Sequence, residues 1–445
     1  MFGLKFLGNT HVPHRKNTAS SCPVRMIPDG EMLFPTIQHI GAPATPIVKK
    51  GDEVKVGQKI AEANAPLCSP IYSSVSGTVV GIEPYMRATG DACEAIRIKS
   101  DGLMTPYEGI TVPVIDDFDS FVNAVRESGV VGLGGAGFPT AIKLASAKKA
   151  NIDTVVINGA ECEPYLTSDT QTMLTSGAYI KAGVELLSKY FAPKSIVFAI
   201  EKNKPDCIKA IGDLFADDSV VSVCSLPALY PQGAEKVAIY NSTGRIVPEG
   251  KLPADVGVLV MNVTSLAKIA EYVETGMPLV EKCVTVDGSA IASPKNVIVP
   301  VGTLIKDLIA FTGGLSAEVG KVIFGGPMMG VAADSLDEPI AKTTNGITVF
   351  AEADSRAPEA TACIHCGRCV RACPLSLNPI AFAGALNIAS KEERMARLDA
   401  EKIEICMLCG CCSFVCPAAR PLVQNNKMAK GELREYKAHQ STLEK

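Results

Sequence analysis

Two cysteine runs near the C-terminus constrain this chain more than any other feature. Each run has the spacing C-x2-C-x2-C-x3-C and is followed directly by a proline. The runs are Cys363, Cys366, Cys369 and Cys373 before Pro374, and Cys406, Cys409, Cys412 and Cys416 before Pro417. Runs of this kind hold [4Fe-4S] clusters in pairs, because three close thiolates bind one cubane and the fourth reaches the other. The sequence therefore predicts two [4Fe-4S] clusters.

The displaced fourth cysteine of each run predicts crossed ligation. The two expected ligand sets are Cys363, Cys366, Cys369 and Cys416 for cluster one, and Cys406, Cys409, Cys412 and Cys373 for cluster two. Zinc is the alternative metal, but structural zinc sites take their four ligands in pairs, and two complete runs with a trailing Cys-Pro are unusual for it. The spacing leaves Cys411 unassigned, so we expect it not to be a ligand.

The segment between the runs, NPIAFAGALNIASKEERMARLDAEKI, has apolar residues every three or four positions. This periodicity, together with strong helix formers, predicts helices and hence a helical type of ferredoxin domain. The remaining cysteines stand alone in the sequence and are expected to be small core residues. They are Cys22, Cys68, Cys93, Cys162, Cys207, Cys224 and Cys283.

Composition excludes several classes of function. The net charge of −4 gives no basic field for nucleic acid, so no nucleic-acid partner is expected. Apolar runs such as VGVLVMNV are strand-sized, far short of the roughly 20 residues that cross a bilayer. The first residues have no long apolar stretch of the kind found in export signals. Sixteen cysteines in a chain expected in the cytosol favour metal or redox chemistry over disulfides.

Residues 36–84 alternate short β-patterned stretches with Gly-Asp, Gly-Gln and Ser-Gly turns, which predicts a small all-β unit. The unit resembles the barrel-sandwich hybrid of biotinyl and lipoyl carriers. In those carriers a lysine on an exposed hairpin is modified, whereas no such lysine motif stands in the turn near Ser69 to Ser74. We therefore expect a structural or docking role.

A glycine-rich loop follows in VVGLGGAGFPTAIKL, where Gly132, Gly134 and Gly137 match G-x-G-x-x-G. Glycines allow the backbone to approach a phosphate, and a helix beginning near Pro139 and Thr140 would direct its free N–H groups at that anion. The preceding DDFDSFVNAVRESG is helical in pattern, so the usual dinucleotide unit, which needs a strand there, is not predicted. A strand is expected afterwards in DTVVIN, with acidic residues beyond its carboxyl end, where ligand crevices lie.

GLGGAGFPTAIKL and NGAECEPYLTSD resemble the flavin-binding core of the NADH-oxidising subunit of complex I, whose segments read GRGGAGFP and NADEGEP. Together with the barrel unit, the cysteine runs and CVTVDGSAIASPKNVIVPVGTLIKDLI, which is similar to an SLBB module of β-grasp type, they identify the chain as a member of the RnfC family. The resemblance covers essentially the whole chain. Two positions depart from the pattern: GNTHVPHRK stands where the family has GGIHPP, and Leu133 replaces the complex I arginine.

The resemblance implies FMN and NAD(H) as cofactor and substrate, besides the two clusters. Glu163 would act at the nicotinamide as the catalytic residue. The residues that the resemblance assigns to the FMN and nicotinamide site are Gly132, Gly134, Gly135, Gly137, Lys143, Asn158, Glu161, Glu163, Gly233, Glu235 and Asn262. Lys143 would lie near the flavin phosphate or ring.

The expected fold class is multidomain α/β. Its parts are an N-terminal region with the barrel-sandwich hybrid (1–113), an FMN/NADH-binding α/β domain (114–270), an SLBB module (271–350) and a helical double-cluster domain with the tail (351–445). The implied function is electron transfer between NAD(H), FMN and the clusters, at the cytoplasmic face of the membrane. Its partners would be the membrane-embedded and ferredoxin-like subunits of an Rnf-type complex. The alternatives are a stand-alone NADH dehydrogenase that feeds a soluble acceptor, and a flavin-free relay subunit.

Overall fold

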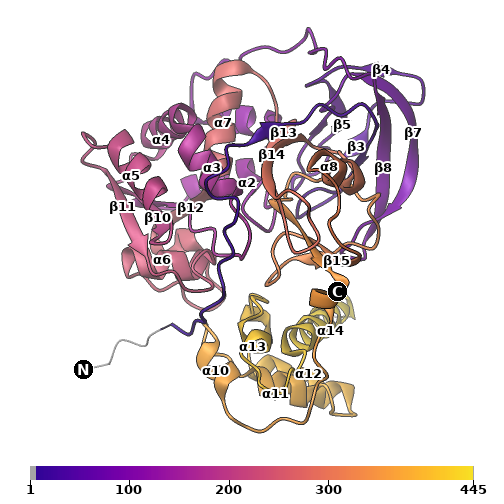
Figure 1. Ribbon diagram of the computed structural model, residues 1–445. Helices are drawn as coiled ribbons and strands as arrows, with labels where there is room; N and C mark the ends of the chain where they lie inside the picture. The colour runs from indigo at the N-terminus through magenta and orange to yellow at the C-terminus, as the bar shows by residue number, and fades with distance from the viewer. Residues whose placement is uncertain (1–6, 444–445) are drawn as a thin grey trace.

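A four-stranded parallel sheet, in the order β11-β10-β9-β12, forms the core of the α/β domain at the left of Figure 1. Its strands are continuous apolar runs, as expected for a sheet covered on both faces. The computed structural model describes residues 7–443. The strands are β9 (Thr154–Asn158), β10 (Ser195–Glu201), β11 (Val221–Leu226) and β12 (Val258–Asn262). The helices of this domain are α1 (Phe118–Glu127), α2 (Thr140–Lys148), α3 (Ser168–Thr175), α4 (Gly177–Phe191), α5 (Pro205–Leu214), α6 (Glu235–Thr243) and α7 (Val263–Thr275), with the 3-10 turn η1 (Pro253–Val256).

The strand order gives this sheet a switch point. From β9 the chain proceeds to β10 and β11 on one side, and then returns to place β12 on the other side of β9. Asn158 and Asn262 are register partners at the carboxyl ends of β9 and β12. In open α/β sheets the ligand crevice lies outside the carboxyl ends of the strands at such a point.

An all-β unit precedes this domain and confirms the β pattern read from residues 36–84. Its strands form two sheets, β2-β8-β7-β4 and β3-β5-β6, around a core that includes Phe34, Ile60 and Ile98. The strands are β2 (Glu31–Pro35), β3 (Thr45–Pro46), β4 (Glu53–Val54), β5 (Lys59–Glu62), β6 (Ile71–Tyr72), β7 (Gly77–Met86) and β8 (Ala92–Ser100).

The hairpin tip of this unit, where carriers bear their lysine, is buried between domains. Ser69 Oγ donates to Gly129 O at 3.2 Å, and Ser74 Oγ donates to Val301 O at 2.5 Å. Lys342 Nζ donates to Ser69 Oγ, and also to the carbonyl oxygens of Pro70 (2.6 Å) and Gly129 (2.8 Å). The tip therefore joins three domains, which is a structural role.

The SLBB region is a mixed sheet with one helix packed on it. The sheet order is β1-β14-β13-β17-β15-β16, and Ile305 and Leu308 of the helix enter its core. The elements are β13 (Glu281–Asp287), β14 (Lys295–Pro300), α8 (Ile305–Phe311), β15 (Val319–Phe324), β16 (Val331–Ala332) and β17 (Gly346–Ala351). One helix over a mixed sheet is the arrangement expected for a β-grasp module.

The N-terminal segment, residues 7–25, runs across the other domains before the chain enters the barrel unit (Figure 1). Thr10 pairs with Tyr230, and Asn296 Nδ2 donates to Thr18 O at 2.9 Å. Strand β1 (Val24–Arg25) then adds to the SLBB sheet, parallel to β14. Residues 7–25 thus pack on domains other than the barrel unit.

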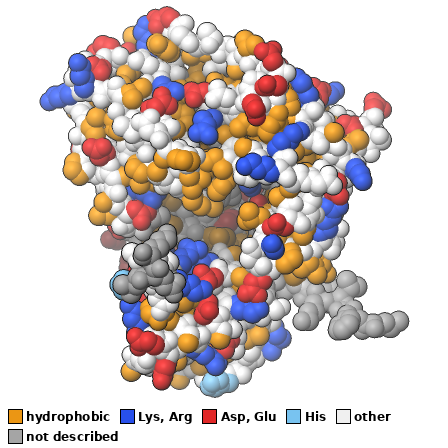
Figure 2. Space-filling view, turned by 180° about the vertical axis from the view of Figure 1, so that it is seen from behind, with side chains coloured by type: hydrophobic (Ala, Val, Ile, Leu, Met, Phe, Trp, Pro, Cys, Tyr) orange, Lys and Arg blue, Asp and Glu red, His pale blue; other side chains and the backbone are white. Residues whose placement is uncertain are grey.

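The cysteine runs lie in a small helical lobe, separated on one face from the larger body by a recess (Figure 2). The segment between the runs is helical, as predicted. The elements are α10 (Arg368–Ala372), α11 (Pro379–Ala385), α12 (Lys391–Ala400), η2 (Ile403–Ile405), α13 (Cys411–Phe414) and α14 (Leu422–Leu443). The short helix α9 (Glu352–Ser355), which comes before them in the chain, packs on β15 and β17 of the SLBB sheet. Across residues 7–443, no helix is both long and apolar enough to cross a membrane.

Candidate functional site

The glycine loop borders the switch point. Val131 and Pro139 form a β-bridge at its base, and α2 begins at Thr140, as predicted. Residues 134–136 are exposed, and no hydrogen bond within the described chain occupies their backbone N–H groups. A Cβ on Gly134 would lie 2.5 Å from Asn262 Nδ2, whereas one on Gly135 would meet nothing within 4 Å. The loop is therefore packed on β12 and has free donors on its open side, which suits a phosphate.

Hydrogen bonds orient the two asparagines at the strand ends. Asn262 Oδ1 accepts from Ser265 N at 3.1 Å, which caps α7, and its Nδ2 donates to Asp169 Oδ2 at 2.8 Å. Asn158 Nδ2 donates to Gly233 O at 2.9 Å. Burial raises the pKa of Asp169 to about 6. Sequence reasoning missed Asp169, because its partner Asn262 lies far along the chain.

Lys143 and Glu235 form an ion pair beside the same crevice. Lys143 Nζ, on α2, lies 2.9 Å from Glu235 Oε1 at the start of α6 and 3.1 Å from Val260 O on β12. Both side chains remain partly exposed. The pair joins the helix after the glycine loop to the loop that contains Gly233, so these predicted residues lie together.

Glu161 uses its carboxylate within the protein. Oε1 accepts from Asp169 N at 2.7 Å, and Oε2 accepts from Thr170 N at 3.1 Å and Thr170 Oγ1 at 2.7 Å. An acidic group at these positions satisfies free N–H groups at the start of α3. Its predicted contact with flavin or NADH stays a prediction, and its carboxylate is occupied here by the helix.

Glu163 reaches across to the SLBB region. Its carboxylate accepts from Met328 N at 3.1 Å and Met329 N at 2.7 Å. A Cβ on Gly326 would lie 2.5 Å from Oε2, so the glycine makes room for the acid. Burial, only partly offset by these N–H donors and Lys16, raises the pKa of Glu163 to about 7. A carboxyl that titrates near neutral pH is typical of functional sites.

Lys16 of the N-terminal segment supports the backbone of this acidic loop. Its Nζ donates to three carbonyl oxygens, those of Glu161 at 2.7 Å, Glu163 at 2.8 Å and Leu166 at 2.6 Å. Burial lowers the pKa of Lys16 to about 8. Lys204 supports the same loop through Ala160 O at 2.6 Å. No sequence signal identified either lysine, since both act on backbone atoms far away in the chain.

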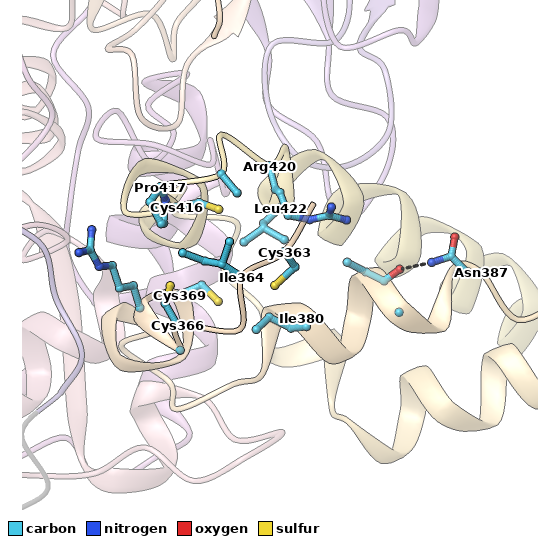
Figure 3. Close-up of a pocket in the computed structure, with 15 residues that line it drawn as sticks. Cys363, Ile364, Cys366, Cys369, Ile380, Asn387, Cys416, Pro417, Arg420 and Leu422 are labelled. Carbon is cyan, nitrogen blue, oxygen red and sulfur yellow. Dashed lines mark hydrogen bonds between the residues drawn. The ribbon is translucent and has the colours of Figure 1, made fainter. Parts of the chain in front are cut away.

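The first group of thiols surrounds a cavity in the helical lobe. Its volume is about 130 Å³, roughly ten times what one water molecule needs. The lining includes Cys363, Cys366, Cys369 and, from the other run, Cys416 (Figure 3). Among residues 7–443 no three Cys, His, Asp or Glu side chains converge closely enough to hold a single metal ion. Four thiols around so large a space fit a cluster better than one zinc ion.

The second group is more deeply buried. Asn426, itself 1% exposed, directs Nδ2 to the sulfurs of Cys406 at 3.7 Å and Cys412 at 3.9 Å. Cys373, from the first run, packs against the core that contains Cys406 and lies near Cys409. The structure thus brings each fourth cysteine to the opposite run. Donors to cluster sulfurs tune reduction potentials, and Asn426 was not foreseen from the sequence.

A small apolar core joins the second group to the flavin-type domain. It contains Cys409, Cys411, Tyr230 and Cys162, together with Val12 of the N-terminal segment. Tyr230 OH donates to Cys409 O at 2.8 Å. Cys411 is buried here beside Tyr230 O, as a packing residue would be.

Family models match in the order of the observed domains. They are described as the RnfC barrel sandwich hybrid domain (residues 4–103), the Nuo51 FMN-binding domain (125–271), the SLBB domain (283–332) and the 4Fe-4S dicluster domain (359–420). These matches confirm the predicted four-part fold class.

Two named relatives cover most of the chain. The C subunit of the proton-translocating ferredoxin:NAD(+) oxidoreductase complex of Clostridium ljungdahlii is 43% identical over 380 residues, which is 84% of this chain and 82% of that protein. Its counterpart in the Na(+)-translocating ferredoxin:NAD(+) oxidoreductase complex of Acetobacterium woodii is 42% identical over 396 residues, 87% of each protein.

A solved NAD+-reducing [NiFe]-hydrogenase, in the H2-reduced state, is similar in fold alone. Its TM-score is 0.50 at 18% identity, and the likeness covers 71% of this chain and 63% of that one. The sequence relatives and the domain order together decide the family. The chain belongs to the RnfC family of ion-translocating ferredoxin:NAD(+) oxidoreductase complexes.

Proposed function

We propose that this chain is the NAD(H)-reacting peripheral subunit of an Rnf-type complex, with FMN at the switch point and two [4Fe-4S] clusters in the helical lobe. The observation that carries the proposal is the direct connection between the two sites. The second cysteine group is joined to the domain of the glycine loop through Tyr230 and the core around it. An electron carrier held there would be next to the flavin-type domain.

The residues of the crevice fit a phosphate-bearing flavin. The exposed loop at Gly134 and Gly135 offers free N–H donors, and Lys143 supplies a cation beside it. Asn158 and Asn262 are already oriented at the two strand ends. When bound, FMN and the clusters supply the exchange between hydride transfer, which moves two electrons, and single-electron transfer.

Glu163 is the proposed catalytic residue because it follows β9 and burial raises its pKa to about 7. Asp169, whose pKa is raised to about 6, is already bonded to Asn262 and Thr264. It is held on both sides: Met328 N and Met329 N fix the carboxylate, and Lys16 fixes its backbone. We infer that Glu163 orients the nicotinamide substrate by hydrogen bonding. A group held in this way loses little freedom when substrate binds.

The names of the relatives support the partners and the location. Both are described as subunits of ferredoxin:NAD(+) oxidoreductase complexes that translocate protons or Na(+). For this chain we propose membrane-embedded and ferredoxin-like partner subunits, and a location at the cytoplasmic face of the membrane.

The test is rapid mixing of NADH with the anaerobically purified chain, with flavin and cluster absorption followed separately. Flavin bleaching that precedes cluster bleaching is expected, and Glu163→Gln should slow the first phase at unchanged iron content. Full iron loading with no bound flavin and no response to NADH would refute the proposal in favour of a flavin-free relay. Full activity without association with membrane subunits would favour the stand-alone dehydrogenase.

A further inference from the structure

The two segments that carry the cysteine runs contain no acidic residue. Residues 360–390 and 405–430 include five cations and not one Asp or Glu, in a chain with 47 acids and 43 Lys and Arg. The cations are Arg368, Arg371, Arg420, Lys427 and Lys430. The acids that follow these segments stand on α12, at Glu401, on η2 and on the later part of α14, and Glu359 directly precedes the first segment. The segments that carry the cysteine runs are therefore cationic, and the acids of the lobe lie outside them.

Three of these cations lie at the first cysteine group. Arg368 and Arg420 line its cavity with Cys363 and Cys416. Arg368 and Arg371, three residues apart on α10, line an adjoining groove of about 480 Å³ next to Cys416. Both of these α10 arginines are exposed.

These arginines differ from others nearby in lacking acidic partners. Arg356 and Arg394 are paired with Glu352 and Glu432. Within the described part of the chain, no carboxylate lies within 4 Å of Arg368, Arg371 or Arg420, and Arg420 donates only to a backbone carbonyl at 3.4 Å. Their charge is thus available to a partner.

Large apolar side chains lie among these arginines. Ile364, which lines the cavity with Arg368 and Arg420, is 66% exposed. Phe414, which lines the groove with Arg368 and Arg371, is 47% exposed. Each is adjacent in sequence, or next but one, to a cysteine of the runs. An exposed apolar patch among charges of one sign is typical of a protein-binding surface.

Neutralisation of cluster charge is another reason for cations near thiolates. Lys430 has the position for that role, because its Nζ is partly buried and donates to Cys406 O at 2.5 Å in the second group. Arg368 and Arg371 instead lie exposed on α10. Their exposure favours contact with another molecule.

We propose that the patch formed by Ile364, Arg368, Arg371, Phe414 and Arg420 docks an acidic one-electron carrier protein of the ferredoxin type. The proposal rests on the proposed function and adds the exit surface and the charge of its partner. Opposite charges would steer the carrier, and the apolar side chains would exclude water at the contact. One electron would pass in either direction, with one protein oxidised as the other is reduced, and no bond or proton would change.

The experiment measures association of the anaerobically purified, cluster-loaded chain with an acidic two-cluster ferredoxin at about 20 mM and 300 mM salt. Over this range the screening length falls from about 20 Å to about 6 Å. Binding should weaken at least tenfold at the higher salt concentration, and a basic carrier such as cytochrome c should not bind. This comparison needs no variant, so it holds even if substitutions beside the cysteines disturb the clusters.

Charge reversal then locates the surface. Arg368→Glu with Arg371→Glu should slow association about tenfold or more at low salt, and the difference should shrink at high salt. Lys49→Glu with Lys50→Glu, two exposed lysines of the barrel unit, is the matched control and should change little. Phe414→Ser should speed dissociation. Iron content and NADH reduction of flavin are checked in each variant.

The outcomes separate this proposal from the proposed function. One outcome is that NADH reduces the flavin normally while the arginine reversal and the lysine control slow ferredoxin association equally, or while neither slows it. In either case the docking surface is wrong and the proposed function stands. Loss of binding to anionic phospholipid vesicles, with ferredoxin binding intact, would assign the arginines to the membrane and overturn the proposal. A chain that does not react with NADH but binds ferredoxin through this patch would refute only the proposed function.

Discussion

Glu163 should destabilise the folded chain at neutral and alkaline pH. Its pKa rises from 4.5 to about 7 on folding, so between those values the native state binds more protons than the unfolded state. Stability therefore falls as pH rises through this window. Raising the pKa by roughly 2.5, at 1.36 kcal/mol for each pKa unit, lowers the free energy of unfolding by about 3 kcal/mol above pH 7.

Glu163→Gln removes the charge and retains the shape. At pH 8 the removal of the buried charge should raise the free energy of unfolding by about 3 kcal/mol. The substitution should also cost about 1 kcal/mol, because one amide oxygen replaces two carboxylate oxygens as acceptor for Met328 N and Met329 N. The net gain of about 2 kcal/mol should raise the melting temperature by roughly 4–8 °C for a domain of this size. At pH 5, where Glu163 is already protonated, the two proteins should melt within a few degrees of each other.

The assay is thermal unfolding of flavin-depleted protein at pH 5 and pH 8, with equal iron content. Glu161→Gln is the matched control, two residues away, and should have the opposite sign at pH 8. Its carboxylate caps α3, so the neutral amide should cost about 0.5–2 kcal/mol. If Glu163→Gln lowers the melting temperature at pH 8, or shifts it equally at both pH values, the burial argument is wrong.

Three further predictions concern the clusters and the N-terminal segment. Anaerobic protein should contain about eight irons and eight acid-labile sulfides per chain, and stoichiometric zinc would contradict the cluster assignment. Cys373→Ala should damage the same paramagnetic signal as Cys406→Ala, and Cys416→Ala the same signal as Cys363→Ala, whereas pairing within each run would refute crossed ligation. Lys16→Met should remove the Lys16 donor from three carbonyls and lower the affinity for NADH more than the iron content. Lys16→Arg should restore part of that affinity. An unchanged KM for NADH in Lys16→Met would exclude this positioning role.

Local patterns were sufficient for much of the fold. The spacing of the cysteine runs predicted the lobe, and the apolar period between them predicted α11 and α12. The glycine loop predicted the start of α2, since a free helix end and flexible residues are local properties. The predicted roles of the site residues remain predictions, although Gly134 and Asn262 do lie in contact.

Features that depend on distant parts of the chain could not be foreseen. Lys16 acts on carbonyls about 150 residues away, and nothing in its sequence context identifies them as its partners. Asn426 is one amide in an ordinary helix until the fold brings it to Cys406 and Cys412. Glu161 was grouped with Glu163 because both follow β9, but their carboxylates face different partners.

The path of the N-terminal segment has a consequence for biosynthesis. Val24 pairs with Val297, and Thr10 pairs with Tyr230, so the first residues made have partners that are made much later. At about 5–20 residues per second, roughly 14–55 s separate the synthesis of Val24 and Val297. The carbonyls that Lys16 contacts, those of Glu161, Glu163 and Leu166, are likewise made about 150 residues after it.

Flavin insertion should therefore follow release of most of the chain from the ribosome, because the crevice is completed by its earliest segment. Contacts of such long sequence separation also slow folding, since loop closure comes before any gain from the contact. A fragment that begins at residue 114 would contain every predicted flavin contact and still lack Lys16. Such a fragment should need residues 7–25, supplied as a separate peptide, to order the loop that carries Glu163.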